Sequence, residues 1–328
     1  MTGEPRRSVI DTCSLVYDSA GWVAYLHRLA EHAPEYLSVF ARSFVRCLGV
    51  EPAVWERLTG QLADPVARAA ALEAIAFDLP AFDLDEYLER RAGEGVVGEI
   101  AMGSAHGLAD GTTVNERLAA MAQRSAGRLH PWGGVVLRDP QEALKELQHC
   151  LDLGMRGFNV IPFLDDVDVT DPVFRPVFEL ADRHRLGLWL HTGHHFARRT
   201  SAEVCTWRHV DVLASRYPQL HVVVGHAGWP WIREMTTIAM RHPNVMLEIS
   251  SHRPRTFGLA GSGWESLLFH GPRALARSVM FGTSTWVNPV PIGVLVEELL
   301  SLDLPEEVLD LWLHGNAARL LGVIEGPS

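Results

Sequence analysis

Short apolar runs that alternate with longer amphipathic segments restrict the possible fold more than any other feature of the sequence. Eight of these runs are rich in valine and isoleucine: 8–11, 95–101, 130–136, 157–162, 187–191, 220–226, 245–250 and 279–283. Most do not alternate between apolar and polar residues, which is typical of strands buried on both faces. Helix signals lie between them, such as Asp139-Pro140 and Asp171-Pro172, where aspartate caps a helix and proline takes its first position.

The repeat of strand and helix predicts a parallel sheet. Eight such units in 328 residues favour a closed (β/α)8 barrel, the TIM barrel of the α/β class, formed as one domain over residues 1–328. An open, doubly wound sheet is the structural alternative. No Gly-x-Gly-x-x-Gly motif follows the first run, which weakens a dinucleotide-binding interpretation of that alternative.

One interval interrupts the repeat. Residues 18–85, between the first two runs, contain helical patterns but no strand pattern, so we predict a helical insertion over residues 19–82. Loops that follow the strands of a barrel lie on its catalytic face. The insertion is therefore expected to form a cap or lid over the barrel mouth, and a dimerisation surface or packing against the side of the barrel is the alternative.

Composition excludes several classes of protein. The formal net charge is −11 and no cluster of lysine and arginine occurs, so no nucleic-acid partner is expected. Four cysteines lie far apart without a Cys-x-x-Cys pair, which favours reduced thiols in a cytoplasm. No apolar run is long enough for a secretory signal or a membrane span. We expect a soluble, cytoplasmic protein without a membrane partner.

Two histidines close neighbouring strands of the predicted barrel. His191 ends the fifth run and His226 ends the sixth, and the ends of adjacent parallel strands are close enough for both side chains to share one cavity. Histidine titrates near neutral pH and suits acid–base chemistry or metal binding. A single histidine at such a place is often only a hydrogen-bonded core residue, but a neighbouring pair favours a catalytic site.

Other polar and aromatic residues at or just beyond the strand ends are candidates for substrate binding. Alternatives stay open for several: Cys13 as a small buried apolar residue, and Trp286 as packing on the rim. Arg198 and Arg199 would hold a carboxylate or belong to a solvated loop, and Glu248 would be a base if it points inward or an arginine partner if it points outward. The predicted binding residues are Cys13, Asn159, His194, Trp229, Ser250, Ser284 and Trp286.

Seven stretches of the sequence are informative as a set: Ile10-Asp11-Thr12, Asn115-Glu116-Arg117-Leu118, Gly154-Met155-Arg156-Gly157-Phe158, Leu190-His191-Thr192-Gly193, Gly225-His226-Ala227-Gly228, Phe281-Gly282-Thr283-Ser284 and Gly315-Asn316-Ala317-Ala318-Arg319-Leu320-Leu321-Gly322. Together they resemble the amidohydrolase-related family, in the branch of aminocarboxymuconate-semialdehyde decarboxylase. The similarity runs from about residue 83 to residue 323 and leaves out the helical insertion. It implies one divalent metal, usually zinc, held by His-x-His after strand 1, a His after strand 5 and an Asp after strand 8, with an acid/base His after strand 6.

The resemblance assigns His191 to the metal ligand after strand 5 and His226 to the acid/base. The other ligand positions depart from the family, because Cys13-Ser14-Leu15 replaces His-x-His and Ser284 replaces the aspartate. Leucine cannot bind a metal, and serine is a poor zinc ligand at neutral pH. We therefore predict a degenerate metal site with no assigned ligand and no favoured cofactor; zinc held by His191 with Cys13 or other histidines is the second option.

The resemblance implies a lyase or hydrolase, for example a decarboxylase, that acts on a small carboxylated or aromatic metabolite. His226 would be the acid/base and His191 would position the substrate, without the family's usual metal. The alternative is a non-catalytic relative that binds a metabolite or a partner protein. The resemblance also implies a homodimer.

Overall fold

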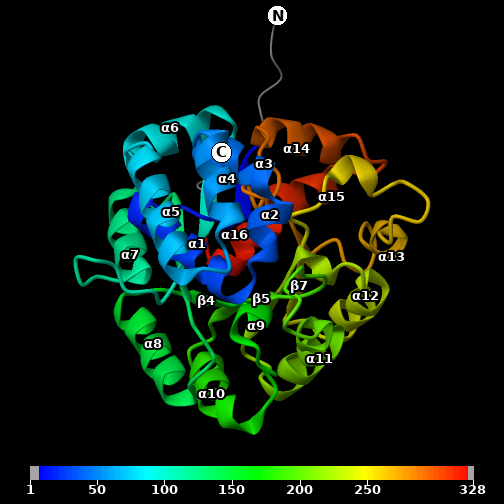
Figure 1. Cartoon of the computed structure of the whole chain (residues 1–328). Helices are drawn as coiled ribbons and strands as arrows, with labels where there is room; N and C mark the ends of the chain where they lie inside the picture. Colours follow the sequence, from blue (N-terminus) through cyan, green and yellow to red (C-terminus); the bar gives the residue numbers. More distant parts are fainter. Residues whose placement is uncertain (1–6, 324–328) are drawn as a thin grey trace, which may run out of the picture.

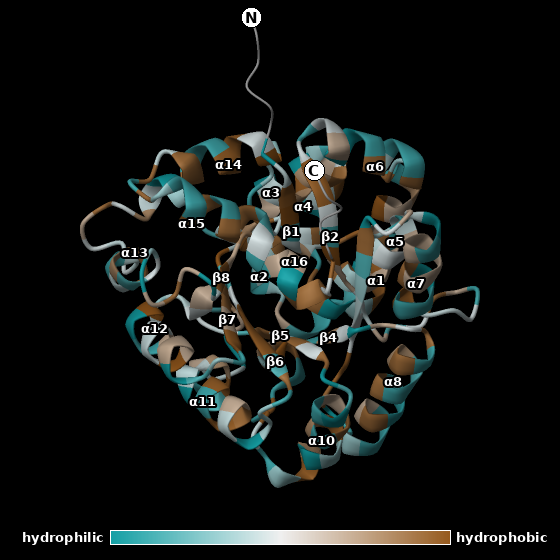
Figure 2. Cartoon of the chain, turned by 180° about the vertical axis from the view of Figure 1, so that it is seen from behind, coloured by the Kyte–Doolittle hydropathy of each residue, from teal (hydrophilic) through white to brown (hydrophobic). Residues whose placement is uncertain are grey.

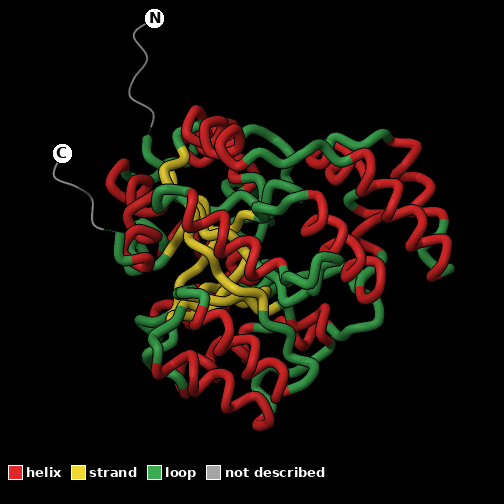
Figure 3. Tube along the Cα trace, turned by 90° about the vertical axis from the view of Figure 1, so that its left-hand side faces the viewer, coloured by secondary structure: helices red, strands yellow, loops and turns green. Residues whose placement is uncertain are grey.

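Eight parallel strands form the centre of the molecule. The structure, a computed structural model, describes residues 7–323. The strands pair in chain order from β1 to β8, each parallel to the next, and they lie inside a ring of helices (Figure 3). The strands are β1 (Val9–Ser14), β2 (Val96–Met102), β3 (Leu129–Gly134), β4 (Gly157–Val160), β5 (Gly187–His191), β6 (His221–Gly225), β7 (Val245–Glu248) and β8 (Val279–Met280).

The last strand meets the first and closes the ring. The Thr12 amide donates to the Phe281 carbonyl at 3.1 Å, and the Ser284 amide donates to the Cys13 carbonyl at 3.0 Å. The predicted (β/α)8 barrel is therefore confirmed. β8 is shorter than predicted, because its continuation hydrogen-bonds to side chains and loops rather than extending the strand ladder.

Helices follow the strands and surround them (Figure 1). Their starts agree with the sequence signals: the Asp139 carboxylate accepts hydrogen bonds from two backbone amides of α8, and Thr113 and Glu116 form a capping box on α7. The α-helices are α1 (Ser19–His32), α2 (Glu35–Val39), α3 (Ala41–Leu48), α4 (Pro52–Gly60), α5 (Pro65–Asp78), α6 (Leu84–Gly93), α7 (Val114–Arg124), α8 (Pro140–Asp152), α9 (Pro162–Asp165), α10 (Arg175–Arg183), α11 (Trp207–Arg216), α12 (Ile232–Arg241), α13 (Glu265–His270), α14 (Ile292–Leu300), α15 (Glu306–Asp310) and α16 (Asn316–Leu321).

Hydrophobic residues concentrate on the strands and hydrophilic residues on the outward helix surfaces (Figure 2). The main core lies between the strands and the outer helices, where burial of apolar area supplies the driving force for folding. Among the described helices, none combines the length and the apolar character needed to cross a bilayer.

Helices α1 to α5 occupy the interval between β1 and α6 and have a hydrophobic core of their own. Leu37, Phe44 and Trp55 are buried within it. The same cluster includes Phe163, which follows β4, and Trp286, which follows β8. The insertion is thus packed against the C-terminal ends of the strands, where barrel enzymes carry their active sites.

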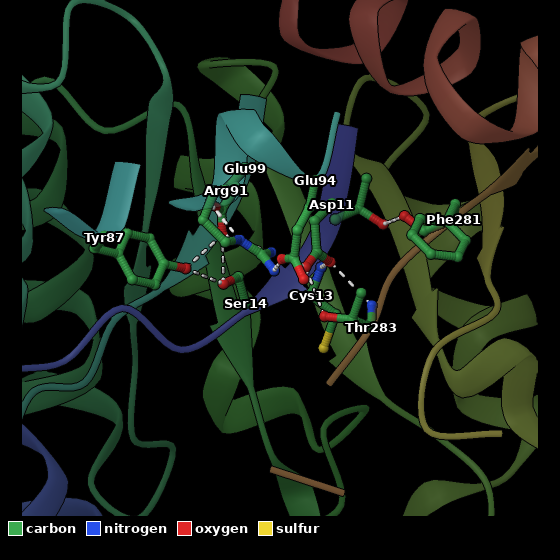
Figure 4. A network of polar contacts seen from close by, with 10 residues as sticks. Asp11, Cys13, Ser14, Tyr87, Arg91, Glu94, Glu99, Phe281 and Thr283 are labelled. Atoms are coloured by element: carbon green, nitrogen blue, oxygen red, sulfur yellow. Dashed lines mark hydrogen bonds and ion pairs between the residues drawn. The ribbon is translucent and has the colours of Figure 1, made fainter. Parts of the chain in front are cut away.

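A buried ionic network fixes the first strand to its neighbours (Figure 4). The Arg91 guanidinium of α6 donates to Asp11 of β1 at 2.6 Å and to Glu99 of β2 at 2.8 Å. The Thr283 amide and hydroxyl donate to the Asp11 carboxylate at 2.9 and 2.6 Å, which links β1 to the segment after β8. Burial raises the pKa of Asp11, while the charge of Arg91 opposes that shift. The carboxylates of Asp11 and Glu99 are thus both engaged in structural contacts.

Candidate active site

A cavity of about 270 Å³ opens at the C-terminal ends of the strands. Aromatic and aliphatic side chains make up most of its wall, as is typical of small-molecule sites. Tyr25, Tyr36 and Phe40 of the insertion line it on one side, and the barrel's strand ends line it on the other. The insertion therefore supplies part of the cavity wall.

His191 and His226 meet at this cavity. His191, the last residue of β5, pairs with Gly225, the last residue of β6. His226 is the next residue after Gly225 and therefore lies beside the end of β5. Their ring centroids lie 5.0 Å apart, with the rings nearly perpendicular, and both residues line the cavity. The structure thus brings together the two histidines that the sequence placed at adjacent strand ends.

Burial favours the neutral form of both imidazoles. Burial, with a smaller contribution from His252, lowers the pKa of His226 to about 3. Burial, followed by the neighbouring His226, lowers the pKa of His191 well below its ordinary value. Both rings are therefore neutral at pH 7 in the free protein. A bound carboxylate would raise their pKa values, because an opposite charge favours the protonated ring.

Glu248 lies behind His226 and points into the barrel, which settles the orientation that the sequence left open. Its Oε2 accepts hydrogen bonds from the Ser250 hydroxyl at 2.9 Å and from the Trp189 indole at 3.2 Å. Burial raises the pKa of Glu248 to about 7. A Cβ added to Gly282 would lie 2.3 Å from Oε1 of Glu248 and 3.1 Å from the Cys13 Cβ, so the carboxylate fills the space beside that glycine.

Six of the seven predicted binding residues line the cavity: Cys13, Asn159, His194, Trp229, Ser284 and Trp286. The exception is Ser250, which is fully buried and whose hydroxyl lies 2.8 Å from Nδ1 of His226. Ser250 therefore lies next to His226 and not on the cavity wall, and its contact with substrate stays a prediction.

Two of the lining residues, Asn159 and Trp286, make structural contacts with other parts of the protein. The Asn159 amide nitrogen donates to the Gly103 and Trp132 carbonyls. Trp286 stacks on Phe44 with ring centroids 4.7 Å apart, so it belongs to the aromatic core of the insertion.

The cation at the cavity comes from the insertion. Arg198 and Arg199 are exposed and do not line the cavity. Arg28 of α1 does, and among the described residues it is the only lysine or arginine that does so. Arg28 is 6% exposed and its Nη2 donates to Asp165 at 2.7 Å. One weak signal for it was present in the sequence, an arginine among the apolar residues of a predicted helix.

Comparison with known proteins agrees with this geometry. The pattern of the amidohydrolase family matches residues 32–323, which is most of the chain. The chain belongs to the amidohydrolase family. This amidohydrolase is also similar to a curated 2-amino-3-carboxymuconate-6-semialdehyde decarboxylase of Dictyostelium discoideum, with 22% identity over 243 residues. That match covers 64% of this chain and 66%, just under two thirds, of the relative.

Solved structures share the fold of this amidohydrolase. An uncharacterized TIM-barrel protein from Bordetella bronchiseptica superposes with a TM-score of 0.67 at 23% identity, covering 96% of this chain and 98% of that one. A 5-carboxyvanillate decarboxylase from Novosphingobium aromaticivorans, complexed with manganese and 4-hydroxy-3-methoxy-5-nitrobenzoic acid, superposes with a TM-score of 0.57 at 17% identity, covering 97% and 96%.

The bound manganese contradicts the prediction that no metal cofactor is favoured, since a decarboxylase of the same fold carries one. The donors of this amidohydrolase do not fit such an ion. Over residues 7–323, no three His, Cys, Asp or Glu side chains lie together as a metal site. At the positions that the resemblance assigns to metal ligands this chain has Leu15 and Ser284, and Asp11 is engaged by Arg91. One observation points the other way, because Nδ1 of His191 is buried without a partner among the described residues.

Proposed function

We propose that this amidohydrolase is a decarboxylase of small aromatic carboxylic acids, with His226 as the residue that delivers a proton to the substrate carbon. One observation carries the proposal: an aromatic-walled cavity at the barrel mouth has His226 and the guanidinium of Arg28 on its wall. The similarity to decarboxylases of carboxylated aromatic and semialdehyde compounds supports the same class of reaction.

The cavity suits a planar ring that carries a carboxylate. Rings of Tyr36 and Phe163 stack on each other with centroids 5.4 Å apart, and both line the cavity. Such walls favour aromatic substrates, because aromatic rings gain from offset or edge contacts beyond the area they bury. The Nη1 and Nε groups of Arg28 make no hydrogen bond to another described residue, so they are available to a substrate carboxylate.

Loss of CO₂ from an aryl carboxylate consumes one proton. The ring carbon gains a bond to hydrogen, the bond from that carbon to the carboxylate breaks, and its electron pair returns to the ring. A ring hydroxyl group stabilises the protonated ring before CO₂ leaves. His226 supplies the proton from Nε2, since its Nδ1 is engaged by Ser250. The ring centroid of His191 lies 4.6 Å from that of Phe163. In this proposal His191 positions the substrate against the aromatic wall of the cavity.

The insertion acts in this proposal as a cap. Tyr25 and Arg28 of α1 and Tyr36 of α2 line the cavity, so α1 and α2 complete the site and exclude water from it. Water exclusion strengthens the interaction between the Arg28 guanidinium and a carboxylate.

The test is a turnover screen of the purified chain against hydroxylated benzoic acids and unsaturated aliphatic carboxylic acids. Each acid is tested with and without added Mn²⁺, because a relative carries that ion. CO₂ release is measured, and NMR in D₂O locates the deuterium in the product. We expect deuterium at the carbon that lost the carboxylate, and loss of turnover in His226→Gln at unchanged folding. Binding of these acids without turnover would favour the non-catalytic alternative and refute the proposal.

A further inference from the structure

A hydrogen-bonded chain leads from Glu248 to the proposed catalytic histidine. The Ser250 hydroxyl donates to Oε2 of Glu248 at 2.9 Å and lies 2.8 Å from Nδ1 of His226. Glu248 and Ser250 are fully buried, at 0% exposure. Neither residue lines the cavity, so Glu248 reaches the proposed reaction through the residues that it hydrogen-bonds, of which Ser250 leads to His226.

Glu248 is held in place without a counter-charge. Its carboxylate accepts from the Trp189 indole and from the backbone amides of His226 and Ser250. Among residues 7–323 no lysine, arginine or histidine forms an ion pair with it. A buried carboxyl group without a counter-charge is costly, and such groups gather at functional sites.

The direction of the hydrogen bonds fixes the tautomer of His226. When Glu248 is ionised it can only accept, so the Ser250 hydroxyl gives it its single proton. The Ser250 oxygen must then accept from His226, which places the ring proton on Nδ1 and leaves a lone pair on Nε2. When Glu248 carries a proton, the chain can reverse: Glu248 donates to Ser250, Ser250 donates to Nδ1, and Nε2 carries the ring proton.

We propose that Glu248 is a positioning residue that decides, through the hydroxyl of Ser250, which ring nitrogen of His226 carries the proton. This inference deepens the proposed function and rests on it for its meaning in catalysis. Protonated Glu248 makes Nε2 a donor, as decarboxylation requires.

One proton moves at each link of the hydrogen-bonded chain, so the number of protons is conserved. As the Nε2 proton bonds to the substrate carbon, the Ser250 hydroxyl proton moves to Nδ1 and the Glu248 proton moves to the Ser250 oxygen. CO₂ leaves, Glu248 is ionised, and a proton from solvent restores the starting state. No oxidant or co-reactant is needed.

The pH response of the His226 tautomer depends on the titratable groups around the hydrogen-bonded chain of Glu248, Ser250 and His226. Cys13 of β1 faces Glu248, and burial raises the pKa of its thiol well above its ordinary value, so the thiol stays neutral. His252 and His191 face His226, and burial lowers both of their pKa values. Glu248, with a pKa of about 7, is therefore the group of this cluster that titrates near neutral pH.

The tautomer can be read directly by ¹⁵N NMR of histidine-labelled protein, with His226 assigned from the signal lost in His226→Gln. In the wild type we expect the proton on Nε2 at pH 5.5 and on Nδ1 at pH 8.5, with a midpoint of about 7. Glu248→Gln and Glu248→Met, which cannot titrate, should each show one tautomer over this range. Ser250→Ala should also abolish the change. Ser251→Ala is the matched control and should keep the change, because the Ser251 hydroxyl has no hydrogen-bond partner within residues 7–323.

Kinetics give a second readout once a substrate is known. In Glu248→Gln we expect kcat to fall about 10²-fold, within the range of positioned proton transfer, with little change in KM and loss of the decline in kcat above pH 7. The double variant of Glu248→Gln with Ser250→Ala should be no slower than the worse single variant, because both break one chain.

Two results would overturn the inference: a His226 tautomer that does not change with pH in the wild type, or a change that persists in Glu248→Gln. These results are independent of turnover. If no acid is decarboxylated but the tautomer responds as expected, only the proposed function fails; if turnover is found and the tautomer is fixed, only the inference fails.

Discussion

Replacing Glu248 with glutamine is expected to change how the stability of the fold depends on pH. The pKa of Glu248 rises from an ordinary value of 4.5 to about 7 on folding, so between these values the folded chain holds a proton that the unfolded chain has released. The free energy of unfolding therefore falls as pH rises from 4.5 through 7. A difference of about 2.5 pKa units at 1.36 kcal/mol each is worth about 3 kcal/mol.

Urea denaturation at intervals from pH 5 to pH 8 measures this effect. The difference between the unfolding free energies of Glu248→Gln and the wild type should grow in favour of the variant by about 2 to 3 kcal/mol over that range. Subtracting the two curves removes the contributions of groups that both proteins share. Glu297→Gln, on an exposed face of α14, is the matched control for the loss of one carboxylate.

A difference that stays constant from pH 5 to pH 8 for Glu248→Gln would refute the reasoning, because it would mean that folding does not raise the pKa of this carboxyl group. A carboxyl group whose pKa is lowered by the hydrogen bonds from Trp189 and Ser250 would be ionised throughout this range and would give the same constant difference.

Three further substitutions test other parts of the structure. Arg91→Met should lower the free energy of unfolding by about 3 to 5 kcal/mol in urea denaturation, because it leaves buried carboxylates unpaired; a loss below about 1 kcal/mol would contradict the role given to this network. Trp286→Ala should cost about 3 to 5 kcal/mol and lower Tm, since it empties a buried aromatic position beside Phe44; an unchanged Tm would show that the insertion does not depend on it. Arg28→Lys should raise KM for a carboxylated substrate about 10-fold or more with kcat nearly unchanged, because lysine keeps the charge but loses the paired donors; an unchanged KM would remove Arg28 from substrate binding.

The barrel was predictable because the strand–helix repeat is a local pattern that eight units express independently. The meeting of His191 and His226 followed from it, since adjacent parallel strands bring their ends together. The orientation of side chains was harder to predict. Ser250 lies two residues beyond the end of β7, yet it does not line the cavity, because the spacing of residues along a strand does not say which face meets a neighbouring side chain.

Arg28 was missed for a different physical reason. It belongs to a helix outside the repeating unit, and the phase of an amphipathic helix shows which face is buried but not which element covers it. The partner that fixes its direction, Asp165 of α9, is 137 residues away in the sequence. Contacts of this kind depend on how the insertion is placed on the strand ends, which local patterns do not specify.

The narrow space beside Gly282 ties two distant positions of the sequence together. Because any side chain at residue 282 would collide with the Glu248 carboxylate, a homologue with a larger residue there must shorten or lose the acid on β7. We expect residues 282 and 248 to vary jointly among homologous sequences. Homologues with an acid at position 248 should have glycine at position 282.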